Sequence, residues 1–351
     1  MIIALAAFLA IQDTTRIAEA QTVLSQLVES YGVSGSEAPV RATVQRLLPS
    51  WAKTETDSAG NLWVKLGQGD NPVVIVAHMD EIGFRVDTIN SDGSLTLRNR
   101  GGFILSLWEG KPALIHTDGK DIPGIFLPRD TGLTRRLPPP LRVSVGASTR
   151  VGAESLGVKV GQTITMPKQY VRLAGTRATG RSFDDRMGSA SLILALRQLD
   201  RAKLKHAVYF VFSTREEIGL EGAAAVAHQL GTSTRRVHAI DTFVSADSPL
   251  ELQNFAVARL GAGAVARALD NSSITPPAYV DSLAQLARGR GIALQIGTTN
   301  GGNDGSTFTP FGVVDVPMGW PLRYSHSPAE VVDLKDLLSL ADMVRAVAED
   351  W

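Results

Sequence analysis

The sequence predicts an α/β fold: a three-layer α/β/α domain with a mixed sheet, interrupted by a small β-barrel-like insert. Buried apolar strands alternate with helices of 3.6-residue periodicity over residues 13–86 and 176–351. Over residues 87–175, short alternating segments are separated by Gly, Pro and Asp turns, which is typical of an all-β unit. We therefore expect one discontinuous α/β domain that carries an inserted β-rich domain.

The first part of the α/β domain is predicted to hold two helices and two strands. Apolar residues at helical spacing predict helices over residues 14–32 and 40–48. Strands are expected at 62–66 and, as a buried run, at 73–77. Residues 1–12 are nearly all apolar and would suit a short secretory segment, but no Lys or Arg precedes them, so an extension of the first helix is the alternative.

The same patterns predict the elements of the insert and of the second part of the α/β domain. Alternating segments of the insert lie at 94–100, 112–117, 142–147 and 163–174. The βα rhythm then returns, with helices at 189–199, 223–230 and 280–289 and strands at 207–213, 236–243, 293–297 and 312–318. A closing helix runs to Trp351, and its expected start is a capping box, with Ser327 as N-cap and Glu330 at the third helical position.

Composition excludes several classes of function. The 351 residues are 44% hydrophobic and 20% charged, with a formal net charge of zero, so we expect neither a nucleic-acid footprint nor attraction to an anionic membrane. Absence of Cys excludes disulfides, thiolate metal sites and a Cys nucleophile. Any metal ion must therefore be held by imidazole and carboxylate groups.

Acids and a histidine follow three of the predicted strands. His78 and Asp80 come after the strand at 73–77, Glu216 and Glu217 follow the strand at 207–213, and Asp241 stands near the end of the strand at 236–243. Sites in open α/β sheets form beyond the carboxyl ends of the strands. Adjacent acids at the mouth of a buried strand are costly without a partner, and a metal ion is the partner that such a set favours.

Five residues form a sensible ligand set for two divalent ions: His78, Asp184, Glu217, Asp241 and His326. One carboxylate should bridge the ions, and each ion should have a terminal His and a terminal carboxylate. Two-metal hydrolytic sites hold their ions roughly 3.5–4 Å apart and stabilise both the attacking and the leaving oxygen.

The remaining acids then have other roles. Glu216 is free to act as general base, taking a proton from water and passing it to the leaving amine. Asp80 lies two residues after His78 on an extended segment, so it should face the same side and accept a hydrogen bond from the far nitrogen of that ring. Asp185 and Arg186 are expected to support Asp184. We count Glu216 and Asp80 as the catalytic pair.

Each of these features has a plainer explanation when taken alone. His78 alone is more often a hydrogen-bonded core residue, Asp184–Asp185 alone would be a helix cap, and Glu216–Glu217 alone a solvated turn. The combination and its order favour the metal site. Four other histidines lack such partners and are interpreted as surface or structural: His116, His206, His228 and His238.

The motifs that carry these residues resemble one family. They read HMDEIGF, SFDDRMG, TREEIGLEGA, AIDTFVSADSP and RYSHSPAEVVDL. In this order they are similar to the co-catalytic metallo-aminopeptidases of the glutamyl aminopeptidase and tetrahedral-aminopeptidase family, and the resemblance runs from about residue 17 to the end. The insert segment VSVGASTRVGAESLGVKVGQTIT is similar to the dimerisation domain of that family.

The resemblance implies an activity and a set of roles. It matches His78, Asp184, Glu217, Asp241 and His326 to the metal ligands, with Asp184 bridging. It also matches Glu216 to the general base and Asp80 to the acid that orients the first His. It implies zinc or cobalt as the metal, peptides as substrates and assembly as dimers or dodecamers. A cytoplasmic location is implied as well, whereas the apolar residues 1–12 leave export open.

The predicted function is removal of N-terminal residues from peptides, with a metal-bridging water activated by Glu216. The alternatives are a metal-dependent carboxypeptidase or N-acyl amino-acid deacylase on the same fold and, less favoured, an endoglucanase or an inactive metal-binding scaffold. Neighbouring acids such as Glu216 and Glu217 seldom face each other across a glycosidic bond, which needs carboxyls about 5–9 Å apart. The preferred N-terminal residue does not follow from the sequence. Asn303, Asp304 and Ser306 stand on a Gly-rich loop that either lines the substrate pocket or is a plain surface loop.

Overall fold

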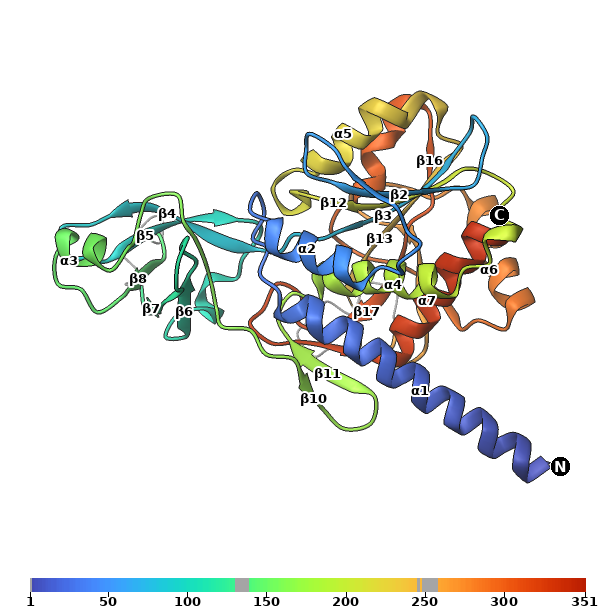
Figure 1. Ribbon diagram of the computed structural model, residues 1–351, viewed down its shortest axis with the longest axis horizontal. Helices are drawn as coiled ribbons and strands as arrows, with labels where there is room; N and C mark the ends of the chain where they lie inside the picture. Colours follow the sequence, from blue (N-terminus) through green and yellow to red (C-terminus); the bar gives the residue numbers. More distant parts are fainter. Residues whose placement is uncertain (1, 130–138, 245–246, 248–257) are drawn as a thin grey trace.

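The computed structural model contains two bodies, an α/β body that holds both ends of the chain and a smaller β barrel beside it (Figure 1). The described residues are 2–129, 139–244, 247 and 258–351. The chain leaves the α/β body after β3 (Val73–His78) and returns to it before α4 (Phe183–Gln198). The predicted fold class, an α/β domain interrupted by a barrel-like insert, is therefore confirmed.

The central sheet is mixed, and its middle strands are parallel. Its strand order is β1-β2-β12-β3-β13-β17-β14-β15, with β16 paired to β13. β12, β3, β13 and β17 run parallel, whereas β2 and β14 pair antiparallel at the flanks. The strands are β1 (Thr54–Thr56), β2 (Leu62–Leu66), β3, β12 (Val208–Ser213), β13 (Arg236–Val244), β14 (Ala264–Leu269), β15 (Leu294–Thr298), β16 (Val314–Asp315) and β17 (Met318–Leu322).

Helices cover both faces of this sheet, which gives three layers. On β3, Val73, Ile75 and Ala77 join the core beneath α1, α4 and α7, while Val74 and Val76 join the core beneath α5 and η5. Because successive residues of a strand face opposite sides, a strand buried on both faces reads as an unbroken apolar run. The helices are α1 (Ile2–Glu29), α2 (Ala38–Leu47), α4, α5 (Glu221–Leu230), α6 (Pro277–Arg290) and α7 (Leu334–Asp350), with short 3₁₀ turns η2 (Arg201–Lys203), η3 (Glu216–Ile218), η4 (Gly231–Ser233) and η5 (Asp304–Phe311).

The insert is a closed barrel with its own core. Its strands are β4 (Gly83–Ile89), β5 (Leu95–Arg100), β6 (Pro112–Ile115), β7 (Ile122–Leu127), β8 (Arg142–Ser144) and β9 (Thr163–Thr165), with η1 (Leu105–Leu107) and α3 (Arg150–Ser155) in its connections. Phe84, Trp108 and Phe126 pack edge to face or tilted at its centre, with ring centroids 5.3–5.7 Å apart. The barrel begins at Gly83 and not at residue 87, because β4 continues almost directly from the buried strand β3.

A buried ionic cluster fixes the barrel to the α/β body. Glu81 lies in the segment that enters the barrel, and Lys168 lies in the segment that leaves it. The Nζ atom of Lys168 is 2.6 Å from Oε1 of Glu81, Arg186 of α4 approaches the same oxygen at 3.3 Å, and Arg181 pairs with Oε2. All four side chains are buried. We call this group, Glu81 with Lys168, Arg181 and Arg186, the Glu81 cluster.

Two expectations about the second half of the chain were wrong. The closing helix begins at Leu334, with Asp333 accepting a hydrogen bond from the N–H of Lys335, so Ser327–Glu330 is no capping box. Glu330 instead opens β18 (Glu330–Asp333), which joins β10 (Val171–Arg172) and β11 (Arg177–Gly180) in a small sheet. β14 was not predicted, because its alanine-rich sequence has low strand propensity and its pairing with β15 and β17 imposes the conformation.

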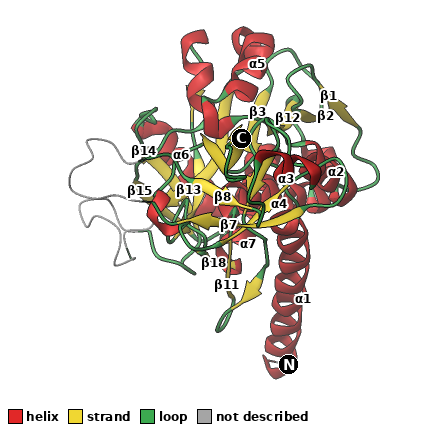
Figure 2. Cartoon of the chain, turned by 90° about the vertical axis from the view of Figure 1, so that its left-hand side faces the viewer, coloured by secondary structure: helices red, strands yellow, loops and turns green. Residues whose placement is uncertain are grey.

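Helix α1 is longer than the sequence predicted. It runs unbroken from Ile2, so the apolar residues 1–12 lie within it from the second residue onward. Its N-terminal end projects from the body of the molecule (Figures 1 and 2). Of the helices that the structure describes, none combines the length and the apolar character needed to cross a bilayer.

Candidate active site

Three neighbouring parallel strands bring acids and a histidine to one edge of the central sheet. His78 is the last residue of β3, and Asp241 lies in the adjacent strand β13. On the other side of β3, strand β12 ends at Ser213, which pairs in register with His78, and Glu216 and Glu217 follow in η3. The structure therefore gathers residues that are far apart in the sequence at the carboxyl ends of the strands, where α/β proteins place their sites.

Asp184 lies between the two histidines. Its Oδ1 is 3.2 Å from Nε2 of His78, and its Oδ2 is 3.4 Å from Nε2 of His326. Nε2 of His326 is also 3.4 Å from Oε2 of Glu217. Two sets of donor atoms share this carboxylate, His78 with Asp241 and His326 with Glu217, and within each set the atoms lie within 4.8 Å of one another. Each set thus offers the N and O donors that divalent transition metals take in proteins.

Glu216 and Asp80 lie beside this cluster on opposite sides of the His78 ring. The Oε2 atom of Glu216 is 3.9 Å from Nε2 of His78, and Oδ1 of the buried Asp80 is 3.4 Å from Nδ1. Asp80 also accepts hydrogen bonds from the backbone N–H groups of Glu216 (3.1 Å) and Glu217 (3.3 Å). One carboxylate therefore fixes both the histidine of β3 and the turn that carries the two glutamates, a second contact that the sequence did not indicate.

The charges of the cluster shift the pKa values of its members strongly. Burial raises the pKa of Glu216 well above its ordinary value, with a contribution from the charges of Asp241 and Glu217. Burial likewise raises the pKa of Asp241 to about 7. Burial would lower the pKa of His78, but the charge of Glu216 and the hydrogen bond to Asp184 raise it well above its ordinary value. Crowded carboxylates of this kind are stabilised in the charged form by a cation placed among them.

Two residues that sequence reasoning missed hold members of the cluster in position. Arg267 of β14 is buried, and its Nη1 is 3.2 Å from Oδ2 of Asp241 while its Nη2 is 2.9 Å from Asp270. Glu330, also buried, accepts hydrogen bonds from the backbone N–H of Phe183 (2.7 Å) and of His326 (3.0 Å), and burial raises its pKa to about 8. Neither role could be inferred from the sequence, because the contacts of Arg267 with Asp241 and of Glu330 with Phe183 join segments that are distant in the chain.

The expected supporters of Asp184 contact other groups. Asp185 accepts a hydrogen bond from the backbone N–H of His78 (2.9 Å), and Arg186 donates to the carbonyl of Leu27 (3.0 Å) and belongs to the Glu81 cluster. Asp185 therefore stabilises the end of β3, and Arg186 stabilises the last turn of α1.

The other histidines lie outside the donor sets that the described residues form. His116 contacts Thr165 (2.9 Å) in the barrel, His228 packs against Phe311, and the buried His238 contacts Arg236 (3.0 Å) and the carbonyl of Val316 (3.0 Å).

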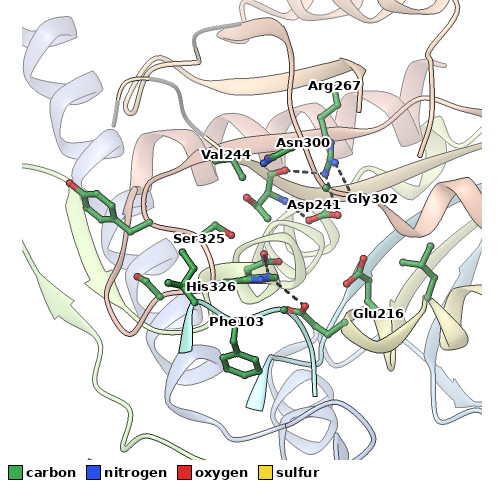
Figure 3. Close-up of a pocket in the computed structure, with 18 of the residues that line it drawn as sticks. Phe103, Glu216, Asp241, Val244, Arg267, Asn300, Gly302, Ser325 and His326 are labelled. Atoms are coloured by element: carbon green, nitrogen blue, oxygen red, sulfur yellow. Dashed lines mark hydrogen bonds and ion pairs between the residues drawn. The ribbon is translucent and has the colours of Figure 1, made fainter. Parts of the chain in front are cut away.

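The cluster opens into a cavity of about 730 Å³ between the barrel and the sheet edge (Figure 3). Asp184, Glu216, Glu217, Asp241 and His326 all line it. The insert contributes Gly102, Phe103, Ile104 and Leu107, and the Gly-rich loop contributes Asn300–Gly302. The three residues that we singled out on that loop, Asn303, Asp304 and Ser306, are not among the residues that line the cavity; Asn303 and Asp304 are buried beneath it.

The donor set fits divalent metal ions on its own chemistry. Oε1 of Glu217 is buried, and the part of the chain that the structure describes gives it no hydrogen-bond partner. Buried polar atoms normally have a hydrogen-bond partner. A buried carboxylate oxygen that lacks one and lies near other carboxylates would be stabilised by a bound cation. His and carboxylate ligands without sulfur suit zinc, cobalt or manganese rather than a thiolate-bound metal.

The fold and the site together define the class of protein, a metal-dependent hydrolase with its site at the edge of an α/β sheet. Its residues 60–343 match the M42 glutamyl aminopeptidase family. The chain belongs to this family, and it is a metal-dependent aminopeptidase.

Individual relatives agree with this assignment. The chain is 26% identical to the glutamyl aminopeptidase of Lactococcus lactis, with 92% of this chain and 93% of that protein covered. It is 27% identical to the lysyl aminopeptidase of Pyrococcus furiosus, with 93% and 96% covered. Among solved structures, the TET1 peptidase of Pyrococcus horikoshii, which can assemble into a tetrahedron or a large octahedral shell, is 32% identical with a TM-score of 0.85, covering 95% of this chain and all of that one.

Proposed function

We propose that the enzyme removes single residues from the N-termini of peptides at a site that holds two divalent ions. The observation that carries the proposal is the position of Asp184, whose two oxygens face different histidines, His78 at 3.2 Å and His326 at 3.4 Å. A carboxylate shared between two donor sets is the arrangement that a bridging ligand requires. Asp241 would complete the first set and Glu217 the second.

Glu216 is the general base in this proposal. Its carboxyl lines the cavity, with Oε2 3.9 Å from Nε2 of His78, and its side chain is only 14% exposed. A carboxylate in this position can take a proton from the attacking water and return it to the leaving amine. Asp80 orients His78 by facing its far ring nitrogen, and it holds Glu216 in place through the backbone N–H.

The ions would polarise the scissile carbonyl and make water a better nucleophile at neutral pH. Zinc is the metal that we propose, and cobalt suits the same donors. The α/β body would form the catalytic domain, and the insert, whose barrel strands run from Gly83 to Thr165, would serve as a dimerisation domain. Assembly beyond a dimer into a dodecamer is the further proposal, supported by the shells that the Pyrococcus horikoshii relative forms. The family assignment favours a cytoplasmic location.

The test is hydrolysis of leucyl-p-nitroanilide beside its N-acetylated twin. The enzyme is stripped with a chelator and then given zinc or cobalt. Metal-restored cleavage of the free-amine substrate alone is expected, because the proposed activity requires a free N-terminus. Cleavage of the acetylated twin would favour a deacylase, and no restoration of activity by any metal would refute the proposal.

A further inference from the structure

The residues that line the cavity determine which N-terminal side chains a peptide substrate can carry. This inference rests on the proposed function. The charged residues that line the cavity, within the described part of the chain, belong either to the acid–histidine cluster or to Arg267. The family assignment does not decide the preference, since one relative is a glutamyl and another a lysyl aminopeptidase. The preference must therefore follow from the surfaces that a substrate side chain meets.

One wall comes from the insert and is apolar. Phe103, Ile104 and Leu107 line the cavity from the segment that links β5 to β6. Ile104 is 59% exposed and Leu107 38% exposed, although both are large apolar residues. Phe103 stacks on Phe84, with ring centroids 4.3 Å apart, and this contact anchors the wall to the barrel core. Figure 3 shows Phe103 on one side of His326.

On the opposite wall, Val244 and Asn300, among the residues that the structure describes, are uncharged as well. Val244, at the end of β13, and Asn300 lie on the other side of His326 from Phe103 (Figure 3). Arg267 borders this wall, but both Nη atoms of its guanidinium already have partners, and its Nε is buried away from solvent. It donates to the carbonyls of Thr242 and Gly302, both at 3.0 Å, in addition to its pairs with Asp241 and Asp270.

Arg267 therefore serves to position the Asp241 carboxylate and is not available to bind a substrate anion. An acidic substrate side chain would have to displace one of its four existing partners. Because those partners include two buried carboxylates, such an exchange would leave a buried charge unpaired, which is unfavourable.

We propose that the enzyme selects peptides whose N-terminal residue carries a large apolar side chain, as in Leu, Met or Phe. The side chain of that residue branches from the Cα atom next to the scissile carbonyl, so it lies close to the metal cluster and within reach of the two walls. The wall residues that the structure describes are uncharged: an apolar side chain gains by leaving water there, whereas the ammonium of Lys or the carboxylate of Glu would lose water without finding a partner on them. The discrimination expected is about 10- to 200-fold in kcat/KM.

The experiment measures kcat/KM of the metal-loaded enzyme on leucyl-, methionyl-, phenylalanyl-, glutamyl- and lysyl-p-nitroanilide. Two variants accompany the wild type. Ile104→Lys places an ammonium on the exposed apolar wall, and Val151→Lys places one on α3 of the same barrel, where Val151 is 73% exposed and does not line the cavity. Both positions are exposed, so neither substitution should disturb folding, and thermal unfolding checks this.

The expected result is a preference for the apolar substrates that Ile104→Lys shifts toward the glutamyl substrate by at least tenfold, while Val151→Lys leaves it unchanged. A wild-type preference for glutamyl or lysyl substrates would overturn the inference and leave the aminopeptidase intact. An unchanged preference in Ile104→Lys would overturn it too. Cleavage of none of the free-amine substrates would instead refute the proposed function, and the inference would fall with it.

Discussion

Glu81→Gln should destabilise the protein more than any comparable change at a surface ion pair. The substitution keeps the shape of the side chain and removes its charge. Glu81 is fully buried and faces Lys168, Arg181 and Arg186, which are buried with it. It also accepts a hydrogen bond from the backbone N–H of Gly32 at 2.8 Å. The variant leaves three cations together in the interior without the carboxylate that they share.

The expected cost follows from this geometry. Removing one partner of a buried ion pair typically costs about 3–5 kcal/mol, because it leaves an uncompensated charge in the interior. Lys168 limits this cost. Burial lowers the pKa of Lys168 well below its ordinary value, although the charge of Glu81 opposes this shift. When Glu81 loses its charge, Lys168 can therefore release its proton and become neutral. We therefore expect the free energy of unfolding to fall by about 3–5 kcal/mol and not by several times that amount.

Urea unfolding at pH 7 measures the effect, with Asp87→Asn as the matched control. Asp87 pairs with Arg98 at 2.7 Å on the same barrel, but the two side chains are 37% and 71% exposed. Such exposed pairs contribute about 0–1 kcal/mol. A loss below 1 kcal/mol for Glu81→Gln, or a loss equal to that of Asp87→Asn, would refute the reasoning.

The difference between wild type and Glu81→Gln should also depend on pH. Burial would raise the pKa of Glu81, but the charges of Lys168, Arg181 and Arg186 outweigh burial and lower it far below the ordinary value of 4.5. A group with a lowered folded-state pKa contributes stability that is fully present above its unfolded pKa and is lost as the pH falls through the folded one. The destabilisation that comes from the Glu81 charge should therefore shrink as the pH falls below about 4.5. A constant difference down to pH 3 would contradict this assignment of the charge.

Substitutions at three further positions probe the site. Glu216→Gln should keep its metal content by elemental analysis and lose about 10²- to 10⁴-fold in kcat, and retained turnover would remove it as the base. Asp184→Ala should lose metal broadly because both donor sets share this carboxylate, and an unchanged metal content would contradict the bridging role. Arg267→Met should weaken metal binding about 10- to 100-fold in a chelator competition, because Asp241 loses the group that positions it, while Arg267→Lys should recover part of that loss. Equal affinities in the two Arg267 variants would argue against positioning.

Much of the fold could be predicted because local signals agreed with the tertiary structure. β3 is an unbroken run of buried apolar residues, and its ends matched the prediction within one residue. β14 could not be found in this way, since Ala264–Leu269 has no β-branched run and depends on its neighbours in the sheet. The start of α7 was misplaced because Ser327 and Glu330 have the letters of a capping box, whereas the carboxylate of Glu330 is used by the backbone of Phe183 and His326.

The candidate site was accessible to sequence reasoning for a related reason. His78 and Glu216 directly follow apolar strands, and the carboxyl ends of neighbouring parallel strands must meet at one edge of the sheet. Arg267 and Glu330 gave no such signal. Arg267 stands inside the alanine-rich strand β14 and Glu330 at the start of β18. Their partners Asp241 and Phe183 come close to them only when the sheet and β18 have formed.

The central claim is that Asp184 bridges two ions, and anomalous X-ray diffraction at the zinc edge tests it most directly. Crystals of the zinc-loaded enzyme should give two anomalous peaks on either side of the Asp184 carboxylate. One peak should lie next to His78 and Asp241, and the other next to His326 and Glu217, at roughly the 3.5–4 Å separation of two-metal hydrolytic sites. A single peak, or two peaks that Asp184 does not contact, would contradict the account.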